Sequence, residues 1–395
     1  MFAIFTKLLT NLASLISPVF YKLLYTSHTA LVTGAVIIMK KLIVLFLAIV
    51  AIFYLAACAK IENNTTPSIS TESITESVPE TTLGIGEADK ISRGINVPLV
   101  RCDNWEKIVD APIMSYDEMR SLDGSTATVH ITAELYRQFY DVTDEELEES
   151  QKNNQDGLTG IFYHSTTHNA YVNLIETLNP EFYGKTTSLI FVTPPSEEEK
   201  QLAKDNNIEL DITPIAKDGF VFITHNDNPV NSLTTEQIQD IYTGKIKNWN
   251  QVGGNNLEIK AYQREANSGS QTTMEQLVMQ GNPMIPSINT MAYSMSGLIE
   301  AVAEYENGTA SIGYTYNYYI NNLYKNDNIK VLNVNGITPA DKNLISEVYP
   351  FTTSYYAVMR SNEPKDSNAT KLRDFLVTPK GQDVIAMAGY CKAIK

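Results

Sequence analysis

Between about residue 95 and the end of the chain, short apolar runs alternate with stretches of helical periodicity. Strands are expected where the apolar runs have strand length, and helices where apolar side chains recur every three or four positions. This pattern predicts strands at residues 190–192, 219–223 and 310–314 and helices at 234–242, 296–305, 371–376 and 382–387. Such alternation predicts α/β layers with mostly parallel strands.

The pattern near the amino terminus is different, because a short basic start is followed by one unbroken apolar run. Met39, Lys40 and Lys41 precede 16 apolar residues that end in Leu-Ala-Ala, directly before Cys58. A charged start, an apolar stretch and small residues before a cleavage point are typical of an export signal. The alternative is a transmembrane helix, but 16 residues are short for a span of about 20. We interpret residues 39–57 as a signal peptide.

The Leu-Ala-Ala-Cys sequence resembles the lipobox of bacterial lipoprotein signal peptides. In that family the cysteine thiol is lipidated and the chain is cut before it, which implies Cys58 as the lipid anchor on the extracellular face of the cell membrane. Ser and Thr supply ten of the 20 residues at 63–82. Because such a composition cannot form an apolar core, we expect residues 58–95 to be a disordered, lipid-anchored linker.

Residues 1–38 are apolar and basic, and they precede a complete signal. They are either a second membrane segment or a stretch that is not translated because synthesis begins at Met39. We favour the second interpretation, since an export signal needs its own amino terminus near its charged start.

The composition limits the classes of protein that remain. A chain of 395 residues with 43% apolar residues can form two globular domains of about 150 residues each. Beyond residue 57 it has 26 Lys and Arg against 45 Asp and Glu, a net charge of −19. We therefore expect no nucleic-acid partner, and an anion would need a local site that overcomes this field. If Cys58 is lipidated, Cys102 and Cys391 remain as a disulfide pair or as two thiols.

One turn has the chemistry of an anion site. Residues 262–273 contain Arg264, Ser268, Gly269 and Ser270 between an expected strand and an expected helix. The first N–H groups of a helix have no internal partner and carry partial positive charge. Hydroxyl groups and a planar guanidinium add donors that suit a tetrahedral oxyanion. The alternative is an ordinary helix cap next to a surface arginine.

Two further turns, at residues 122–128 and 163–170, are also rich in Ser and Thr and also precede expected helices. In open α/β sheets, ligands bind at the carboxyl ends of the strands, where such turns gather. None of the three turns contains a nucleotide-binding glycine motif. Together they predict a site for a small oxyanion.

The chain resembles the phosphate-binding proteins of ABC-type phosphate importers, in the lipoprotein form of Gram-positive bacteria. The resemblance covers residues 118–395 and is most specific over 211–275. The motifs that carry it are Gly219-Phe-Val-Phe-Ile, Asn228-Pro-Val-Asn-Ser-Leu-Thr, Ile241-Tyr-Thr-Gly-Lys-Ile-Lys-Asn-Trp249, Val252-Gly-Gly and the turn at 264–273.

This resemblance implies a two-lobed periplasmic-binding-protein fold (type II), in which each lobe is a mixed sheet flanked by helices. It places two inter-lobe crossings near residues 218–226 and 349–358. Lobe 1 would comprise residues 96–218 and 350–395, and lobe 2 residues 219–349. It also implies an extracellular monomer that captures phosphate in the cleft and hands it to an ABC permease and its ATPase, with no catalysis, cofactor or metal.

The resemblance further implies which residues hold the anion, by their positions in the matching motifs. These ligand-binding residues are Thr128, Ser165 or one of its neighbours Thr166 and Thr167, Arg264, Ser268, Gly269 and Ser270.

One departure from the family concerns selectivity. Known members hold a carboxylate that accepts a hydrogen bond from protonated phosphate, and this acceptor repels sulfate. The matching strand is followed here by Thr193, with no acid at that place. The alternative function is therefore a surface sensing or interaction protein that binds another oxyanion, or none tightly.

Overall fold

A computed structural model describes residues 102, 104–153, 164–176, 186–287, 289–304 and 309–394. All of them belong to the unit Thr81–Lys395. The expected signal peptide, Cys58 and the linker at residues 58–95 lie outside the described residues, so they remain predictions. Within the described ranges, no helix is both long and apolar enough to cross a membrane.

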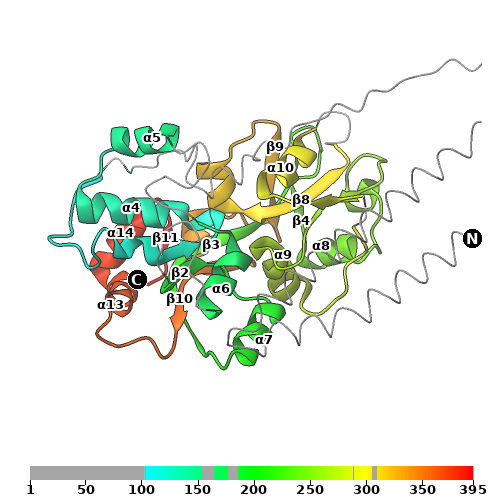
Figure 1. Ribbon diagram of the computed structural model, residues 1–395. Coiled ribbons are helices and arrows are strands. Elements are labelled where there is room, and N and C mark those ends of the chain that lie inside the picture. The colour runs from blue at the N-terminus through cyan, green and yellow to red at the C-terminus, as the bar shows by residue number, and fades with distance from the viewer. Residues whose placement is uncertain are drawn as a thin grey trace, which may run out of the picture. The chain divides into compact units, whose positions relative to one another are not determined.

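The described elements form two groups around one long strand, β3 (Leu210–His225) (Figure 1). Lobe 1 contains the first half of β3. Its other elements are η1 (Glu118–Ser121), β1 (Leu122–Gly124), η2 (Thr126–Thr128), α4 (Val129–Tyr140), α5 (Asp144–Asn153), α6 (Thr167–Ile175), β2 (Leu189–Val192), α7 (Glu197–Asp205), β10 (Thr352–Arg360), α13 (Asn368–Leu376), α14 (Pro379–Met387) and β11 (Cys391–Lys392).

Lobe 2 contains the second half of β3. Its other elements are β4 (Ser232–Leu233), α8 (Thr235–Tyr242), η3 (Trp249–Val252), β5 (Lys260–Ala261), β6 (Gln263–Arg264), α9 (Gly269–Thr273), the π-helical turn η4 (Met274–Met279), β7 (Met291–Ala292), α10 (Met295–Ala303), β8 (Ser311–Tyr316), the π-helical turn η5 (Tyr319–Leu323), β9 (Ile329–Val334) and α12 (Asp341–Ile345).

Strand β3 joins the two lobes by changing its neighbours along its length. It pairs antiparallel with β10 as far as Gly219, and from Phe220 it pairs antiparallel with β8 and β9. The change of partner lies at the start of the first predicted crossing. The prediction of mostly parallel strands is wrong for these pairs, because β3 and β10 run between the lobes in opposite directions. Parallel pairing is found for β1–β2, β4–β9, β5–β8 and β6–β7.

All the strands and helices expected from periodicity are present, with bounds shifted by a few residues. The helix expected at 234–242 is α8, whose cap Thr234 forms a capping box with Gln237. This reciprocal pair satisfies two backbone donors at the helix start. The strand expected at 219–223 is only part of β3, because the first half of β3 is mostly exposed or half-buried and lacks a continuous apolar run.

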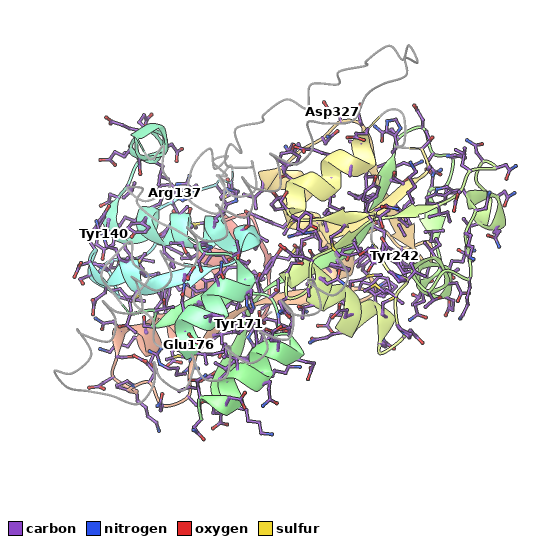
Figure 2. The ribbon with its side chains drawn as sticks, turned by 45° about the vertical axis from the view of Figure 1, so that its right-hand side comes forward. Arg137, Tyr140, Tyr171, Glu176, Tyr242 and Asp327 are labelled. Carbon is purple, nitrogen blue, oxygen red and sulfur yellow. The ribbon has the colours of Figure 1, made fainter. Side chains whose placement is uncertain are left out.

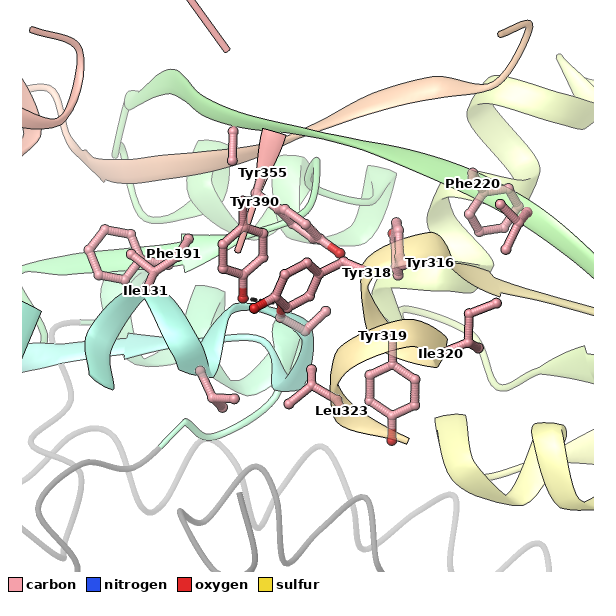
Figure 3. Packing of buried hydrophobic residues seen from close by; sticks show 14 of the residues in the cluster. Ile131, Phe191, Phe220, Tyr316, Tyr318, Tyr319, Ile320, Leu323, Tyr355 and Tyr390 are labelled. Atoms are coloured by element: carbon pink, nitrogen blue, oxygen red, sulfur yellow. Dashed lines mark hydrogen bonds between the residues drawn. The ribbon is translucent and has the colours of Figure 1, made fainter. Parts of the chain in front are cut away.

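Buried tyrosines fill the region where the lobes meet (Figure 3). The ring of Tyr318 stacks on Tyr390 with centroids 3.7 Å apart. The Tyr318 hydroxyl donates to the carbonyl of Ala388 at 2.6 Å, and the Tyr390 hydroxyl donates to the carbonyl of Ala127 at 2.8 Å. Because both hydroxyl groups of this stack have a hydrogen-bond partner, their burial costs little free energy. It links lobe 2 to the turn that begins α4.

A buried carboxyl, Asp218, lies where β3 passes between the lobes. It is 2% exposed and accepts hydrogen bonds from the Tyr355 hydroxyl at 2.7 Å and from the backbone N–H groups of Gly219 and Tyr318. Burial raises its pKa from 3.8 to about 7; these hydrogen bonds lower it, and nearby Asp341 raises it further. The folded chain therefore holds a proton at Asp218 that the unfolded chain has released above pH 4.

We expect Asp218→Asn to remove a pH dependence from the stability of the fold. In the wild type, the folded state binds more protons than the unfolded state between about pH 4 and 7, so Asp218 lowers stability as the pH rises through that window. Each pKa unit is worth about 1.4 kcal/mol. Between about pH 4 and 7, the free energy of unfolding of the variant should therefore rise relative to that of the wild type by up to about 4 kcal/mol. Urea unfolding at pH 5, 6, 7 and 8 measures this, and a constant difference between the two proteins would contradict it.

The two cysteines of the body, Cys102 and Cys391, are free thiols. Burial is the largest cause that raises the pKa of the Cys391 thiol, to about 12. Of the two states left open by the sequence, the structure has unpaired thiols.

Candidate functional site

A polar cavity of about 280 Å³ lies among loops that lead into helices of both lobes. This volume is at the low end for ligand pockets, which suits a small ligand. Lobe 1 contributes the starts of η2 and α6 and Thr193 after β2, and lobe 2 contributes the loop before α9, the start of α10 and Tyr316 of β8. The residues that line the cavity are Ser125, Thr126, Ala127, Thr166, Thr167, His168, Asn169, Thr193, Arg264, Glu265, Ala266, Asn267, Ser268, Gly269, Tyr293, Ser294, Met295 and Tyr316.

Arg264 is the cation of this cavity. It ends the short strand β6 and is 7% exposed, and its Nε donates to the carbonyl of Ala292 at 3.0 Å. Its Nη1 lies 3.4 Å from the Ser270 hydroxyl, and the nearest carboxylate, on Glu265, is 3.8 Å from Nη2. Burial lowers the pKa of Arg264, and Glu265 opposes that shift, yet a guanidinium stays charged at neutral pH. The site therefore holds a desolvated positive charge that is only loosely neutralised.

Four of the residues predicted as ligands line the cavity: Thr166, Arg264, Ser268 and Gly269. Ser268 is the cap of α9, and its hydroxyl accepts from the N–H of Gln271 at 3.3 Å. The N–H groups at the start of the helix that follows have no partner within the helix. The loop thus brings backbone donors and a guanidinium to one place, and whether an anion binds there stays a prediction.

The other three predicted residues, Thr128, Ser165 and Ser270, are not among the lining residues. The Thr128 hydroxyl donates to the carbonyl of Phe191 at 2.6 Å, and the Ser165 hydroxyl donates to Asp123 at 2.6 Å. Ser270 lies behind Arg264, where its hydroxyl supports the guanidinium. These three hydroxyls bond to protein groups around the site. The structure places Ser125, Thr126 and Thr167 at the cavity, of which Thr167 is the second alternative to Ser165.

Two buried residues fix the lobe 1 side. Asp123 accepts from the N–H and the hydroxyl of Ser165 and from the side-chain amide of Asn173. His164 is buried, with Nδ1 2.8 Å from the carbonyl of Ser125 and Nε2 2.9 Å from the Thr132 hydroxyl. Burial lowers the pKa of His164, and the Ser125 carbonyl and Asp123 oppose this shift. No group of three or more metal-ligating side chains is present among the described residues.

Thr166 has backbone strain. Its φ of 79° and ψ of 166° lie in a region that only glycine occupies readily. A threonine there costs on the order of 1–3 kcal/mol, and such strain gathers at functional sites. The conformation starts α6 and sets Thr166 and Thr167 against the cavity.

Thr193 stands at the position where the family pattern has an acid. It follows directly after β2 and is 1% exposed, and the Tyr171 hydroxyl (Figure 2) donates to its carbonyl at 2.8 Å. The only carboxylate among the described lining residues is that of Glu265 in lobe 2, which is 48% exposed. The residue that directly follows β2 is therefore a hydroxyl residue and not an acid.

The lobes touch closely around Gly269. A Cβ at this position would lie 2.3 Å from Oγ1 of Thr193 and 2.7 Å from Oγ1 of Thr167, both in lobe 1. Distances below 3.0 Å force something to move. A second contact between the lobes joins the Gln276 amide to the carbonyl of Pro195 at 3.0 Å. Only glycine at 269 lets the two rims of the cavity approach this far.

Comparisons with known proteins place this geometry in context. The phosphate-binding protein PstS of Borreliella burgdorferi is 28% identical over 200 residues, which are 49% of this chain and 67% of that protein. PstS of Staphylococcus saprophyticus is 29% identical over 195 residues, 48% of this chain and 60% of that protein. The matched part therefore spans about two thirds or less of these relatives.

A solved structure from Clostridium perfringens, assigned as a phosphate ABC transporter substrate-binding protein with bound phosphate, has the same fold. It has a TM-score of 0.50 and 24% identity and covers 69% of this chain and 98% of that one. The family model described as a PBP superfamily domain matches residues 180–379, just over half of the 395-residue chain. The chain therefore belongs to the PBP superfamily.

Proposed function

We propose that this chain is an extracellular, lipid-anchored binding protein that captures inorganic phosphate between its lobes and delivers it to an ABC permease and its ATPase. The relatives named above are phosphate-binding proteins. Catalysis is not part of the proposal.

The observation that carries the proposal is the buried guanidinium of Arg264. A charge taken out of water is costly unless a partner of opposite sign completes it, and the nearest carboxylate is half-exposed and 3.8 Å away. A tetrahedral oxyanion can accept two parallel hydrogen bonds from a guanidinium. The positive charge of Arg264 would also overcome, at this one place, the acidic charge of the rest of the chain.

Because groups of both lobes line the cavity, an anion that contacts both would favour the closed arrangement. Ligand binding then shifts a population towards the state in which the lobes meet. Ser125 and Thr167 in lobe 1 and Ser268 and Gly269 in lobe 2 are the donors that we propose alongside Arg264.

Isothermal titration of the full chain, washed free of ligand, with phosphate and then with sulfate tests the proposal. Heat from phosphate at micromolar concentrations or below supports it. A folded protein that gives no heat with phosphate would overturn it.

The lipid anchor is a separate part of the proposal and rests on Cys58. Two acyl chains give stable attachment because each buried CH₂ contributes about 0.8 kcal/mol. Cys58→Ala should therefore move the protein from the membrane fraction to the medium or the soluble fraction and abolish labelling by radioactive palmitate. Unchanged labelling in the variant would show that another residue carries the lipid.

The absence of an acid at Thr193 favours a second candidate function. A protein on the same scaffold could sense a different oxyanion at the cell surface without any transport role. Stronger heat from sulfate than from phosphate, with no phosphate uptake defect in cells that lack the protein, would favour this second function.

A further inference from the structure

His168 is a group at the cavity that the proposed set of donors does not use. It is the second residue of α6 and lines the cavity beside Thr167. Its Nδ1 lies 3.0 Å from Oε1 of Glu199, a side chain in α7 that is 1% exposed. Among the described residues, no other hydrogen bond of the His168 ring is found, so Nε2 is the ring nitrogen without a protein partner.

Glu199 is held in one orientation. Its Oε2 accepts from the N–H of Ser196 at 2.8 Å, and its own N–H donates to the Ser196 hydroxyl at 3.2 Å. These two bonds form the capping box at the start of α7. Burial raises the pKa of Glu199, and the hydrogen bonds from Ser196 and His168 oppose this shift. Only Oε1 is left for His168.

This orientation decides which ring nitrogen carries the proton. An ionised carboxylate only accepts hydrogen bonds, so a neutral His168 must donate from Nδ1–H. The other nitrogen, Nε2, then has a lone pair and acts as an acceptor. An acceptor is what the end of β2 lacks, since Thr193 stands in the place of the acid.

We propose that Nε2 of His168, oriented by Glu199, accepts the hydrogen bond of a P–O–H group and thereby selects protonated phosphate over sulfate. This inference rests on the proposed function, because it names the specificity-determining residue of the same cavity. Sulfate carries no proton at neutral pH, so its oxygens meet a lone pair and are repelled. His168 contacts the ligand, and Glu199 is a positioning residue.

Glu199→Gln reverses the hydrogen bond and leaves the helix cap in place. Glutamine at this position of a capping box still accepts from the Ser196 N–H through its carbonyl oxygen. Its amide nitrogen then faces His168 and donates to Nδ1. The ring proton moves to Nε2, which becomes a donor to the ligand. The variant should therefore lose its preference for phosphate over sulfate.

The test is titration of the full chain with phosphate and with sulfate at pH 8, where both anions are mainly divalent. A hydrogen bond to a charged group contributes about 1.5–3 kcal/mol, so we expect the phosphate-to-sulfate affinity ratio to fall about 10- to 100-fold in Glu199→Gln. His168→Phe should weaken phosphate binding about tenfold or more, and it should not weaken sulfate binding, because the repelling lone pair is removed. Nitrogen NMR of the imidazole should place the proton on Nδ1 in the wild type and on Nε2 in Glu199→Gln.

Two controls separate this effect from a loss of charge. Glu197→Gln removes one charge from the same helix at an exposed side chain that pairs with Lys200, and it should leave the ratio unchanged. Glu265→Gln removes the one carboxylate among the described lining residues, and a fall of the ratio in this variant would assign the acceptor to Glu265 in place of His168.

Each negative result of these experiments leads to a different conclusion. No heat from either anion with the wild type overturns the proposed function and this inference together. Tight phosphate binding with an unchanged ratio in Glu199→Gln overturns the inference alone. The inference is also overturned if Glu265→Gln loses the selectivity, or if NMR finds both ring nitrogens protonated in the wild type at pH 8.

Discussion

Replacing Arg264 with alanine is expected to weaken phosphate binding on the order of 10²- to 10⁴-fold while the chain stays folded. Each hydrogen bond between a guanidinium and an anion contributes about 1.5–3 kcal/mol, and two parallel bonds are available from the planar fork. Their loss multiplies the dissociation constant by the expected factor. Isothermal titration of the variant with phosphate measures it.

The fold should survive this change because Arg264 gives little stability in return for its burial. Among the described residues, its side chain has hydrogen bonds to the carbonyl of Ala292 and the hydroxyl of Ser270, and the nearest carboxylate, on Glu265, is 3.8 Å away. Replacing a buried, poorly paired charge is often neutral or stabilising. Urea unfolding of the unliganded variant should give a midpoint no lower than that of the wild type by more than a few tenths molar.

Two further variants show whether the shape or only the charge of Arg264 matters. Arg264→Lys keeps the charge but loses the planar fork, so its affinity should lie between those of the wild type and the alanine variant. Arg373→Ala removes a positive charge from α13, where Arg373 pairs with Asp211 and Asp374, and should change affinity less than about threefold. An equal loss in Arg264→Ala and Arg373→Ala would point to the field of the whole molecule and not to a site.

The sequence predicted the Arg264 loop better than the lobe 1 turns, and local chemistry explains why. In the loop at residues 264–269, one short stretch of chain provides the cation Arg264, the helix cap Ser268 and the glycine Gly269, so a local pattern is sufficient. In lobe 1, Thr128 and Ser125 lie in the same turn and are equally suitable from their chemistry. Only the carbonyl of Phe191, which accepts from Thr128, decides that Thr128 faces the interior. That contact joins residues 63 positions apart and leaves no local signal.

The antiparallel pairs and the His168–Glu199 contact have the same explanation. The alternation of elements predicted α/β layers, but it carries no information on the direction in which β3 and β10 run. His168 and Glu199 are 31 positions apart, and each has an ordinary local role as a residue near a helix start. The single signal that pointed to them was the missing acid at Thr193, which indicates that another acceptor is needed but not where it lies.

Gly269→Ala is expected to weaken phosphate binding about 5- to 150-fold without destabilising lobe 2. An added Cβ would lie 2.3 Å from the Thr193 hydroxyl and 2.7 Å from the Thr167 hydroxyl in the opposite lobe. Overpacking of this kind costs about 1–3 kcal/mol, which the closed arrangement alone would bear. The apparent affinity falls by the factor by which the closed state is depopulated.

The same substitution should leave the free energy of unfolding equal or higher, because Gly269 is the first residue of α9 and alanine is the better helix former by about 1 kcal/mol. This opposite response of stability and affinity separates a closure effect from damage to the fold. Removing one of the opposing hydroxyls supplies the matched control: in a double-mutant cycle, Thr193→Ala should restore part of the affinity that Gly269→Ala loses. If the two changes are additive, or if Gly269→Ala binds phosphate as the wild type does, then Gly269 does not govern the approach of the two rims.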